Sequence, residues 1–211
     1  MMIFRDRLDA GQQLAEALAA YRETHPLVLA IPRGGVPLGR VIADALNGDL
    51  DVVLVRKLGA PYNPEFAVGA IGESGKVFVA DYAERAGADS RYLAEEADRQ
   101  LATIRRRRAQ YDQVHVPVSA TGRTVIVVDD GLATGATMGL ALQEVRSHQP
   151  AKLICAVPVA SPEAMVAVRA LCDEVVCLQV EAEFGGVGRF YADFRQVEDD
   201  EALRLLADPR R

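Results

Sequence analysis

The chain has few residues of the kinds that build metal centres and disulfide frameworks. Its 211 residues include only three cysteines and three histidines. No CxxC pair occurs, and His25, His115 and His148 lie too far apart to match a zinc-ligand spacing. Each cysteine falls in an apolar segment, so we expect reduced thiols in the core. The three are Cys155, Cys172 and Cys177.

Long apolar runs and net positive charge are missing as well. No apolar stretch approaches the about 20 residues that a membrane-spanning helix needs. The N-terminal segment is charged from Arg5 onward, unlike a secretory signal peptide. The net charge of −6 disfavours nucleic acid or an anionic membrane as a partner. We therefore expect a cytoplasmic protein in which any site for an anionic substrate is a local feature.

What the chain does contain is an alternation of helical and strand-like segments. Apolar strands are predicted at 27–31, 51–56, 124–128, 152–159 and 174–180, and a β-hairpin at 66–82 with a turn at Ser74-Gly75. Helices are predicted at 10–22, 37–47, 90–111, 136–148, 162–171 and 198–207. The strands are continuously apolar, which is typical of a parallel sheet covered on both faces. The fold class is therefore α/β: a doubly wound, mainly parallel five-stranded sheet with helices on both faces.

The long helix at 90–111 carries a run of four arginines, Arg105–Arg108. Ser90 is the expected N-cap of this helix. The arginines could form a nucleic-acid patch, but acidic residues at positions 95, 96 and 98 precede them on the same helix. A solvated helix face is the favoured interpretation.

Three of the predicted strands are followed by segments rich in glycine, charge and hydroxyl groups. These segments are PRGGVPLG (32–39), RKLGAPYNPE (56–65) and DDGLATGAT (129–137). Because ligands of open α/β sheets bind at the carboxyl ends of the strands, we interpret the three segments as one site.

The segment after the third strand is suited to a phosphate. Its glycines, Gly131 and Gly135, allow close backbone approach, and the following helix offers free N–H groups. Asp129 and Asp130 would repel a phosphate at contact, so we expect them to face another part of the same ligand. Sugar hydroxyls, or Mg²⁺ held directly or through water, suit carboxylates. The alternative is that Asp130 and Thr134 only cap the helix.

A second anion site is indicated by the loop Pro32–Gly35. Its backbone amides and the guanidinium of Arg33 suit an anion, although a tight turn with Arg33 in solvent is the alternative. Arg56 and Lys57 are expected to end a strand at the same edge of the sheet. Two anion sites with acids between them predict a ligand that is phosphorylated at both ends.

The stretch VIVVDDGLATGAT (125–137) resembles the 13-residue motif of the type I phosphoribosyltransferases. It departs from that motif only at Gly131, where a hydrophobic residue is usual. PRGG resembles the pyrophosphate loop of the family, and Arg56-Lys57 resembles the basic pair before its mobile catalytic loop. The resemblance covers the order of elements from about 27 to 180. It implies one domain over 1–211, with a core at about 27–180 and a small hood formed by 181–211 and part of the N-terminus.

The resemblance also implies a reaction and its residues. Phosphoribosyl pyrophosphate would bind with Mg²⁺ and transfer its 5-phosphoribosyl group to a nucleobase or related small acceptor through an oxocarbenium-like transition state. Asp129, Asp130, Arg33 and Lys57 would be catalytic, the two acids engaging the ribose hydroxyls. The 5′-phosphate would be bound by Ala133, Thr134, Gly135, Ala136 and Thr137, and the pyrophosphate by Arg33, Gly34, Gly35, Arg56 and Lys57. A lid is expected, and residues 59–65 are the candidate.

The sequence indicates the acceptor less clearly than the phosphoribosyl donor. Ala133 stands where hypoxanthine/guanine-type members carry an aspartate, and the LATG loop resembles adenine- and uracil-type loops. Glu65 and Glu73 are candidate replacements, or ordinary exposed carboxylates. Aromatic residues are dense in the expected hood, where one could stack on a base or all could pack in the core. These are Phe184, Phe190, Tyr191 and Phe194.

Two function classes stay open at this level. The first is the Mg²⁺-dependent phosphoribosyltransferase, and the second is a regulator of the same fold that only senses phosphoribosyl pyrophosphate or a nucleotide. The basic residues Arg33, Arg56 and Lys57 favour the enzyme, because a nucleotide sensor needs no pyrophosphate site. Whether the chain forms a homo-oligomer is also left open.

Overall fold

The central feature of the computed structural model is a sheet of five parallel strands in the order β2-β1-β6-β7-β8. The structure describes residues 3–207, apart from the side chain of Glu65. The strands are β1 (Leu27–Ala30), β2 (Asp49–Val52), β6 (Thr124–Val128), β7 (Lys152–Ala160) and β8 (Glu174–Val180). Each is connected to its parallel neighbour through a helix or a longer excursion, as parallel pairing requires.

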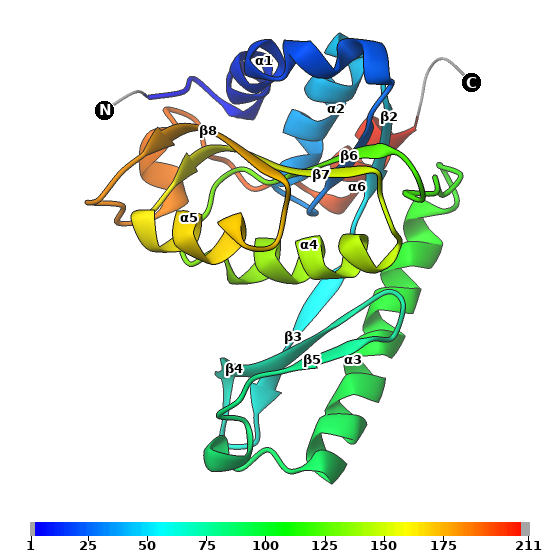
Figure 1. The fold of residues 1–211 in the computed structure, drawn as a ribbon, viewed down its shortest axis with the longest axis vertical. Coiled ribbons are helices and arrows are strands. Elements are labelled where there is room, and N and C mark those ends of the chain that lie inside the picture. Colours follow the sequence, from blue (N-terminus) through cyan, green and yellow to red (C-terminus); the bar gives the residue numbers. More distant parts are fainter. Residues whose placement is uncertain (1–2, 208–211) are drawn as a thin grey trace.

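Helices cover both faces of this sheet (Figure 1). Helices α1 (Arg7–Ala17) and α2 (Gly35–Ala45) lie on one face, and α4 (Ala136–Ser147) and α5 (Pro162–Arg169) on the other. Alternate residues of each strand belong to two separate hydrophobic cores. Val28 and Ile126 face α1 and α2, whereas Leu27 and Val125 face α4 and α5. The doubly wound α/β fold predicted from the apolar strands is confirmed.

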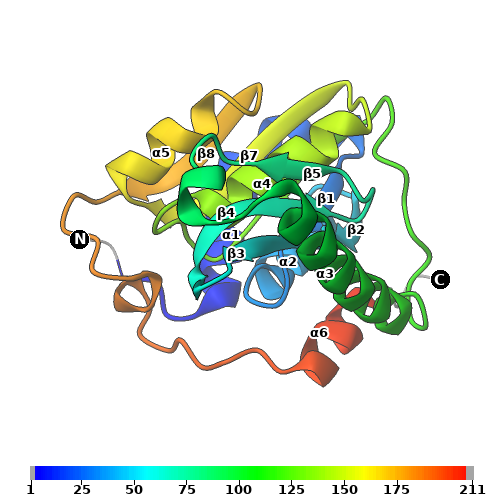
Figure 2. The ribbon, with the colours of Figure 1, turned by 90° about the horizontal axis from the view of Figure 1, so that it is seen from below.

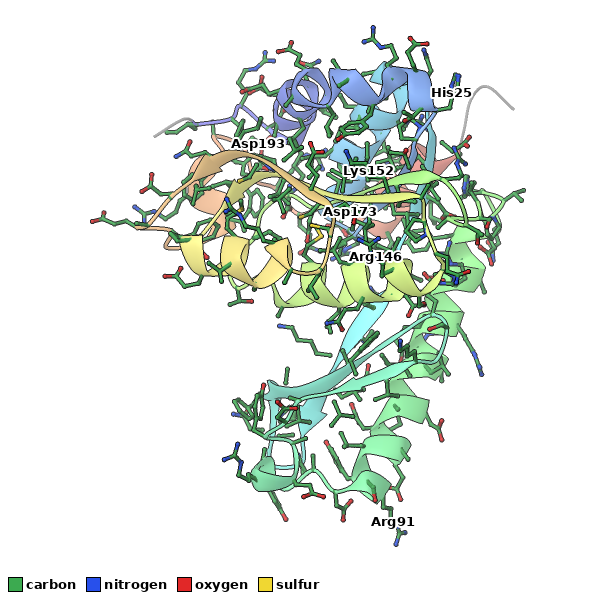
Figure 3. All side chains as sticks on the ribbon, in the orientation of Figure 1. His25, Arg91, Arg146, Lys152, Asp173 and Asp193 are labelled. Atoms are coloured by element: carbon green, nitrogen blue, oxygen red, sulfur yellow. The ribbon has the colours of Figure 1, made fainter. Side chains whose placement is uncertain are left out.

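A second, antiparallel sheet projects from the α4 face as an arm (Figures 1 and 2). It consists of β3 (Val55–Ala60), β4 (Asn63–Gly72) and β5 (Val77–Val79), in the order β3-β4-β5. The short helix η2 (Glu84–Ala86) and the long helix α3 (Ser90–Tyr111) complete the arm, residues 55–111. Arg91, near the start of α3, marks its far end (Figure 3). The predicted hairpin at 66–82 is confirmed as β4 and β5.

The predicted strand at 51–56 is wrong, because two strands share that stretch. β2 ends at Val52, and β3 begins at Val55 in the other sheet, where it pairs with Gly72 of β4. Arg56 and Lys57 therefore lie within the arm and do not end a strand of the central sheet. The break between β2 and β3 is not visible in the apolar run VVLV, because buried residues of both sheets are equally apolar.

Three predictions about helices need correction. The predicted helix at 10–22 is α1, which ends at Ala17, followed by the 3₁₀ helix η1 (Ala19–Thr24). The N-cap of α3 is Asp89, whose carboxylate accepts a hydrogen bond of 2.8 Å from the Tyr92 amide, and Ser90 is the first helical residue. Arg108 does not belong to a solvated face, because its side chain is only 18% exposed and paired with Asp51 and Glu73.

The last part of the chain wraps back over the α1 and α2 face. It contains η3 (Val187–Phe190) and α6 (Asp199–Leu206), the latter packed against α2 (Figure 2). Phe4 bridges to Tyr191 in parallel and donates an amide hydrogen bond of 2.8 Å to the Phe190 carbonyl. The N-terminal segment and residues 181–207 thus lie together; residues 208–211 of the expected hood fall outside the described part of the chain. Within residues 3–207, no helix combines the length and apolar character needed to cross a membrane.

Candidate active site

The loop between β6 and α4 has open backbone amides at the start of a helix. Gly135 adopts a left-handed conformation with φ of 73° and precedes α4 directly. The Leu132 amide donates to the Val159 carbonyl (2.9 Å), and the Ser161 hydroxyl donates to the Ala133 carbonyl (2.8 Å), which fixes the loop. Within residues 3–207, the amides at 133–135 and 137 have no hydrogen-bond acceptor. Such amides form an anion cradle at a helix N-terminus.

Gly131, the departure from the family motif, has a structural partner in Val187. A Cβ added at Gly131 would lie 2.7 Å from Cγ1 of Val187 and 3.0 Å from Cγ1 of Val159. Val187 belongs to η3 and also lines the cavity beside the loop. The place of the usual hydrophobic side chain is therefore filled from the C-terminal segment.

The two acids of the motif face different surroundings. Asp129 lines a cavity of about 180 Å³ together with the loop residues 131–137, Met138 and Val187. Asp130 turns the other way, toward Gly34 and Arg7: a Cβ added at Gly34 would lie only 2.2 Å from its Oδ2. The geometry thus separates an acid that faces the anion loop from an acid that faces the N-terminal helix.

Arg7 is a site residue that the sequence did not reveal. Its Nε and Nη2 donate to Asp130 Oδ2 at 2.9 and 2.7 Å, and its Nη1 donates to the Arg195 carbonyl at 2.7 Å. The guanidinium also lies over the Phe194 ring, 4.0 Å from its centroid. Because 123 positions separate Arg7 from Asp130 along the chain, no local motif could have indicated the pair. Arg7 links the acid motif to the C-terminal segment.

Burial shapes the protonation of this acid pair. The pKa of Asp129 is raised well above its usual range, first by burial and then by the charge of Asp130. The pKa of Asp130 is also raised by burial, and the charge and hydrogen bonds of Arg7 oppose that rise. The Tyr191 hydroxyl donates to the Asp130 backbone carbonyl at 2.7 Å. The pair would therefore be stabilised by additional positive charge placed near Asp129.

The loop Pro32–Gly35 lies beside Asp130, and its Pro32–Arg33 peptide is cis. The Gly35 amide donates to the Ile31 carbonyl at 3.0 Å, so the amides left open in this part of the described chain are those of Arg33 and Gly34. The Arg33 guanidinium is directed to Asp199 of α6, at 3.4 Å. Arg33 is thus paired weakly with an acid that is itself 69% exposed.

The basic pair in β3 lies near the start of α4. Lys57 and Thr137 line the same cavity of about 480 Å³, between β3, α3 and the start of α4. Arg56 donates to the Gln100 side chain at 2.5 Å and lines a smaller cavity with Pro32 and Thr137. The segments that were expected to meet do meet here, although Arg56 and Lys57 arrive from the second sheet.

Most of the residues considered for binding the acceptor base pack in the core or form ion pairs instead. Phe184, Phe190 and Tyr191 are buried in the core, and Phe194 is half-buried with one face under Arg7. Glu73 forms an ion pair with Arg108 at the base of the arm, away from the loop at 131–137. The side chain of Glu65 lies outside the described residues. The tip of the β3–β4 hairpin, the lid candidate, exposes Tyr62 to 94%.

No group of three or more His, Cys, Asp or Glu side chains within residues 3–207 is arranged to hold a metal ion. A half-buried carboxylate at Asp129, beside an anion cradle, is nevertheless the kind of hard oxygen donor that suits Mg²⁺ through water. Such an ion would meet the need for positive charge at Asp129. The three cysteines are free thiols; Cys155 is buried, whereas Cys172 and Cys177 are half-buried.

Comparison with known proteins assigns this chain to a family. The family model of the phosphoribosyl transferase domain matches residues 5–195. The chain belongs to the phosphoribosyl transferase domain family. This membership confirms the resemblance noted in the motif at 125–137 and agrees with the observed fold.

Individual relatives support the same family. Two Mycobacterium tuberculosis proteins, each named "Putative phosphoribosyl transferase" (MT0597 and Rv0571c), are 41% identical over 98% of this chain. The match covers 47% of each of them, so the chain spans about half the length of these curated relatives. The crystal structure of TT1426 from Thermus thermophilus is 48% identical, covers 98% of both chains and superposes with a TM-score of 0.88. The AQ2163 protein from Aquifex aeolicus shares the fold at 13% identity, covering 83% of this chain and 74% of its own, with a TM-score of 0.51.

Proposed function

We propose that this chain is a Mg²⁺-dependent phosphoribosyltransferase that moves the 5-phosphoribosyl group of phosphoribosyl pyrophosphate to a nucleobase or related small acceptor. One observation carries the proposal: the anion loop shares one cavity with Asp129 and, through Thr137, another cavity with Lys57. A sugar that is phosphorylated at both ends matches this order of amides, carboxylate and cation.

The residues take distinct parts in this proposal. Open amides and hydroxyls of the 133–137 loop bind the 5′-phosphate, while Asp129 accepts hydrogen bonds from ribose hydroxyls. Asp130 contributes its Oδ1, because Arg7 binds Oδ2. The Arg33 and Gly34 amides, with Gly35 allowing close backbone packing, bind the pyrophosphate with Arg56 and Lys57.

The reaction breaks the bond from ribose C1 to pyrophosphate and forms a bond from C1 to an acceptor nitrogen. Positive charge develops on the ribose and negative charge on the leaving group. Lys57 and Arg56 stabilise the leaving pyrophosphate, and the negative charge of the acid pair stabilises the positive charge on the ribose. A bound Mg²⁺ would neutralise pyrophosphate charge and help orient it. The hairpin at 59–65, in which Tyr62 is exposed, would exclude water when closed.

The domain and its setting belong to the same proposal. Residues 1–211 act as one phosphoribosyltransferase-like domain, with a core at about 27–180 and a hood from 181–211 that includes part of the N-terminus. The Phe4–Tyr191 bridge supports the inclusion of the N-terminal segment in the hood. The acceptor is a small molecule in the cytoplasm, and neither nucleic acid nor membrane is a partner.

The test is an assay of pyrophosphate release. The protein is incubated with phosphoribosyl pyrophosphate, Mg²⁺ and a panel of purine and pyrimidine bases. Release that depends on one base supports the proposal. Tight binding of phosphoribosyl pyrophosphate without release on any base would support the sensing regulator instead. Replacing both acids, Asp129→Asn with Asp130→Asn, should abolish turnover in a folded protein, and surviving turnover would refute their assignment.

A further inference from the structure

The base of the arm contains a buried polar network that the proposed reaction does not use. Arg108 of α3 donates to Asp51 at 2.9 Å, to the Val52 carbonyl at 2.7 Å, and to Glu73 at 2.7 and 2.8 Å. Glu73 also accepts from the Leu54 amide at 2.8 Å. These bonds join the end of β2, the start of the arm and the β4–β5 turn.

Glu144, on α4, forms a second set of polar contacts beside this network. Its side chain is only 3% exposed, and it accepts from both the amide and the hydroxyl of Ser74, each at 2.8 Å. A Cβ added at Gly72 would lie 2.1 Å from Glu144 Oε2, so a glycine is needed for this approach. His148 Nε2 lies 3.5 Å from the same carboxylate. The turn of the arm is thus fastened to α4 by a buried acid.

A cavity of about 480 Å³ lies beside the network and is lined by Asp51, Glu73, Arg108, Glu144 and His148, among others. The carboxylates of Asp51, Glu73 and Glu144 already accept bonds from Arg108, Ser74 or backbone amides. Since these charges are satisfied internally, the cluster is built to hold elements together.

The pairing of β3 with β4 connects the contacts of Glu144 with the basic pair Arg56 and Lys57. Gly72 pairs with Val55, Ile71 with Arg56, and Ala70 with Lys57. Ser74, which is hydrogen-bonded to Glu144, follows Gly72 by two residues, and Gly72 begins the register with the segment that bears the cations. At its other end, α4 begins at the phosphate loop, and Thr137 shares a cavity with Lys57. One helix thus holds the anion loop at its start and the arm near its end.

We infer that Glu144 is a positioning residue that sets Arg56 and Lys57 at the pyrophosphate end of the site through its hydrogen bonds to Ser74 and its close packing on Gly72. The inference rests on the proposed function. It predicts that loosening this anchor weakens pyrophosphate binding and spares binding to the 5′-phosphate loop, because that loop is held separately by Val159 and Ser161.

The experiment compares Glu144→Gln with Glu163→Gln, which changes an exposed glutamate on α5. Calorimetry measures Mg²⁺-pyrophosphate and ribose 5-phosphate binding separately. Glu144→Gln should weaken pyrophosphate binding about tenfold, as expected for a small misplacement of binding groups, and leave ribose 5-phosphate binding unchanged. Amide exchange at 55–58 should accelerate relative to 124–128. Glu163→Gln should change neither.

Equal weakening of both ligands, or faster exchange in the arm with unchanged pyrophosphate binding, would overturn the inference. If Glu144→Gln fails to fold, Ser74→Ala removes one of the same hydrogen bonds and should shift pyrophosphate binding in the same direction; unchanged binding there would also overturn it. A wild-type protein that binds pyrophosphate but transfers to no base would refute the proposed function and leave this comparison intact. A wild-type protein that does not bind pyrophosphate would refute both.

Discussion

The guanidinium of Arg7 holds Oδ2 of Asp130 through two hydrogen bonds, of 2.9 and 2.7 Å, with side chains that are 11% and 13% exposed. Stacking of Arg7 on Phe194 and its bond to the Arg195 carbonyl connect the same group to the C-terminal segment. The motif acid is therefore part of a buried junction between the two ends of the chain. Its removal should affect stability as well as activity.

Arg7→Ala should destabilise the protein by about 3 kcal/mol, because it leaves the buried charge of Asp130 without a partner. Urea unfolding measures this loss. The matched control is Arg5→Ala: Arg5 also pairs with an aspartate, but its side chain is 77% exposed, so the cost should stay below about 0.5 kcal/mol. Adding Asp130→Asn to Arg7→Ala should recover part of the loss. Equal effects of the two arginine variants would contradict the junction.

Gly131→Ala should destabilise the protein by about 1–3 kcal/mol, because the new methyl group would overlap Val187 and Val159. Thermal or urea unfolding provides the measurement. Val187→Ala in the same chain should relieve most of the overlap with η3, so that the double variant is more stable than the sum of the two single changes implies. Strict additivity would show that Val187 does not fill the place of the missing side chain.

The parts of the fold that the sequence predicted are those determined by local pattern. Strands such as 124–128 and 152–159 are buried on both faces and read as uninterrupted apolar runs. The sequence did not predict the break between β2 and β3, because the apolar pattern at 52–55 continues across the change of sheet. Pairing of Val55 with Gly72 depends on residues far along the chain, which local periodicity does not report.

The same distinction applies to the site. The acid pair and its anion loop are contiguous at 129–137, so their chemistry could be recognised in one stretch. Arg7 and Val187 come from the two ends of the chain and meet the loop only in the folded structure. The prediction for Arg108 was wrong because the sequence of a run of arginines does not show which of them is buried. The acids that neutralise it, at positions 51 and 73, lie on other elements.

Asp129→Asn should stabilise the protein at neutral pH, by about 1 kcal/mol, as is common when a destabilised functional group is removed. Burial raises the pKa of Asp129 in the folded state. Between its unfolded pKa of about 3.9 and that raised value, the folded chain binds more protons, so stability falls as pH rises. The advantage of Asp129→Asn should therefore be absent below the unfolded pKa and grow through this window.

Urea unfolding from pH 3 to pH 8 measures this dependence. Asp173 is the matched control with the opposite sign, because its hydrogen bonds from Arg146 and from the Leu153 amide lower its pKa. Arg146 and Asp173 lie close together at the surface, as Figure 3 shows. Asp173→Asn should lose a small amount of stability above its lowered folded pKa and none at lower pH. A pH-independent effect of Asp129→Asn would contradict the assigned burial.

Lys57→Ala should raise the KM for phosphoribosyl pyrophosphate by about tenfold to 100-fold, the value of one charge-assisted contact to a phosphate group. Lys76→Ala is the control, because Lys76 also lies in the arm but next to Phe78 and close to the β4–β5 turn. Steady-state kinetics at several salt concentrations gives the measurement. The effect of Lys57→Ala should shrink as salt rises, since ions screen an exposed lysine. If both lysine variants change KM equally, Lys57 is not part of the pyrophosphate site.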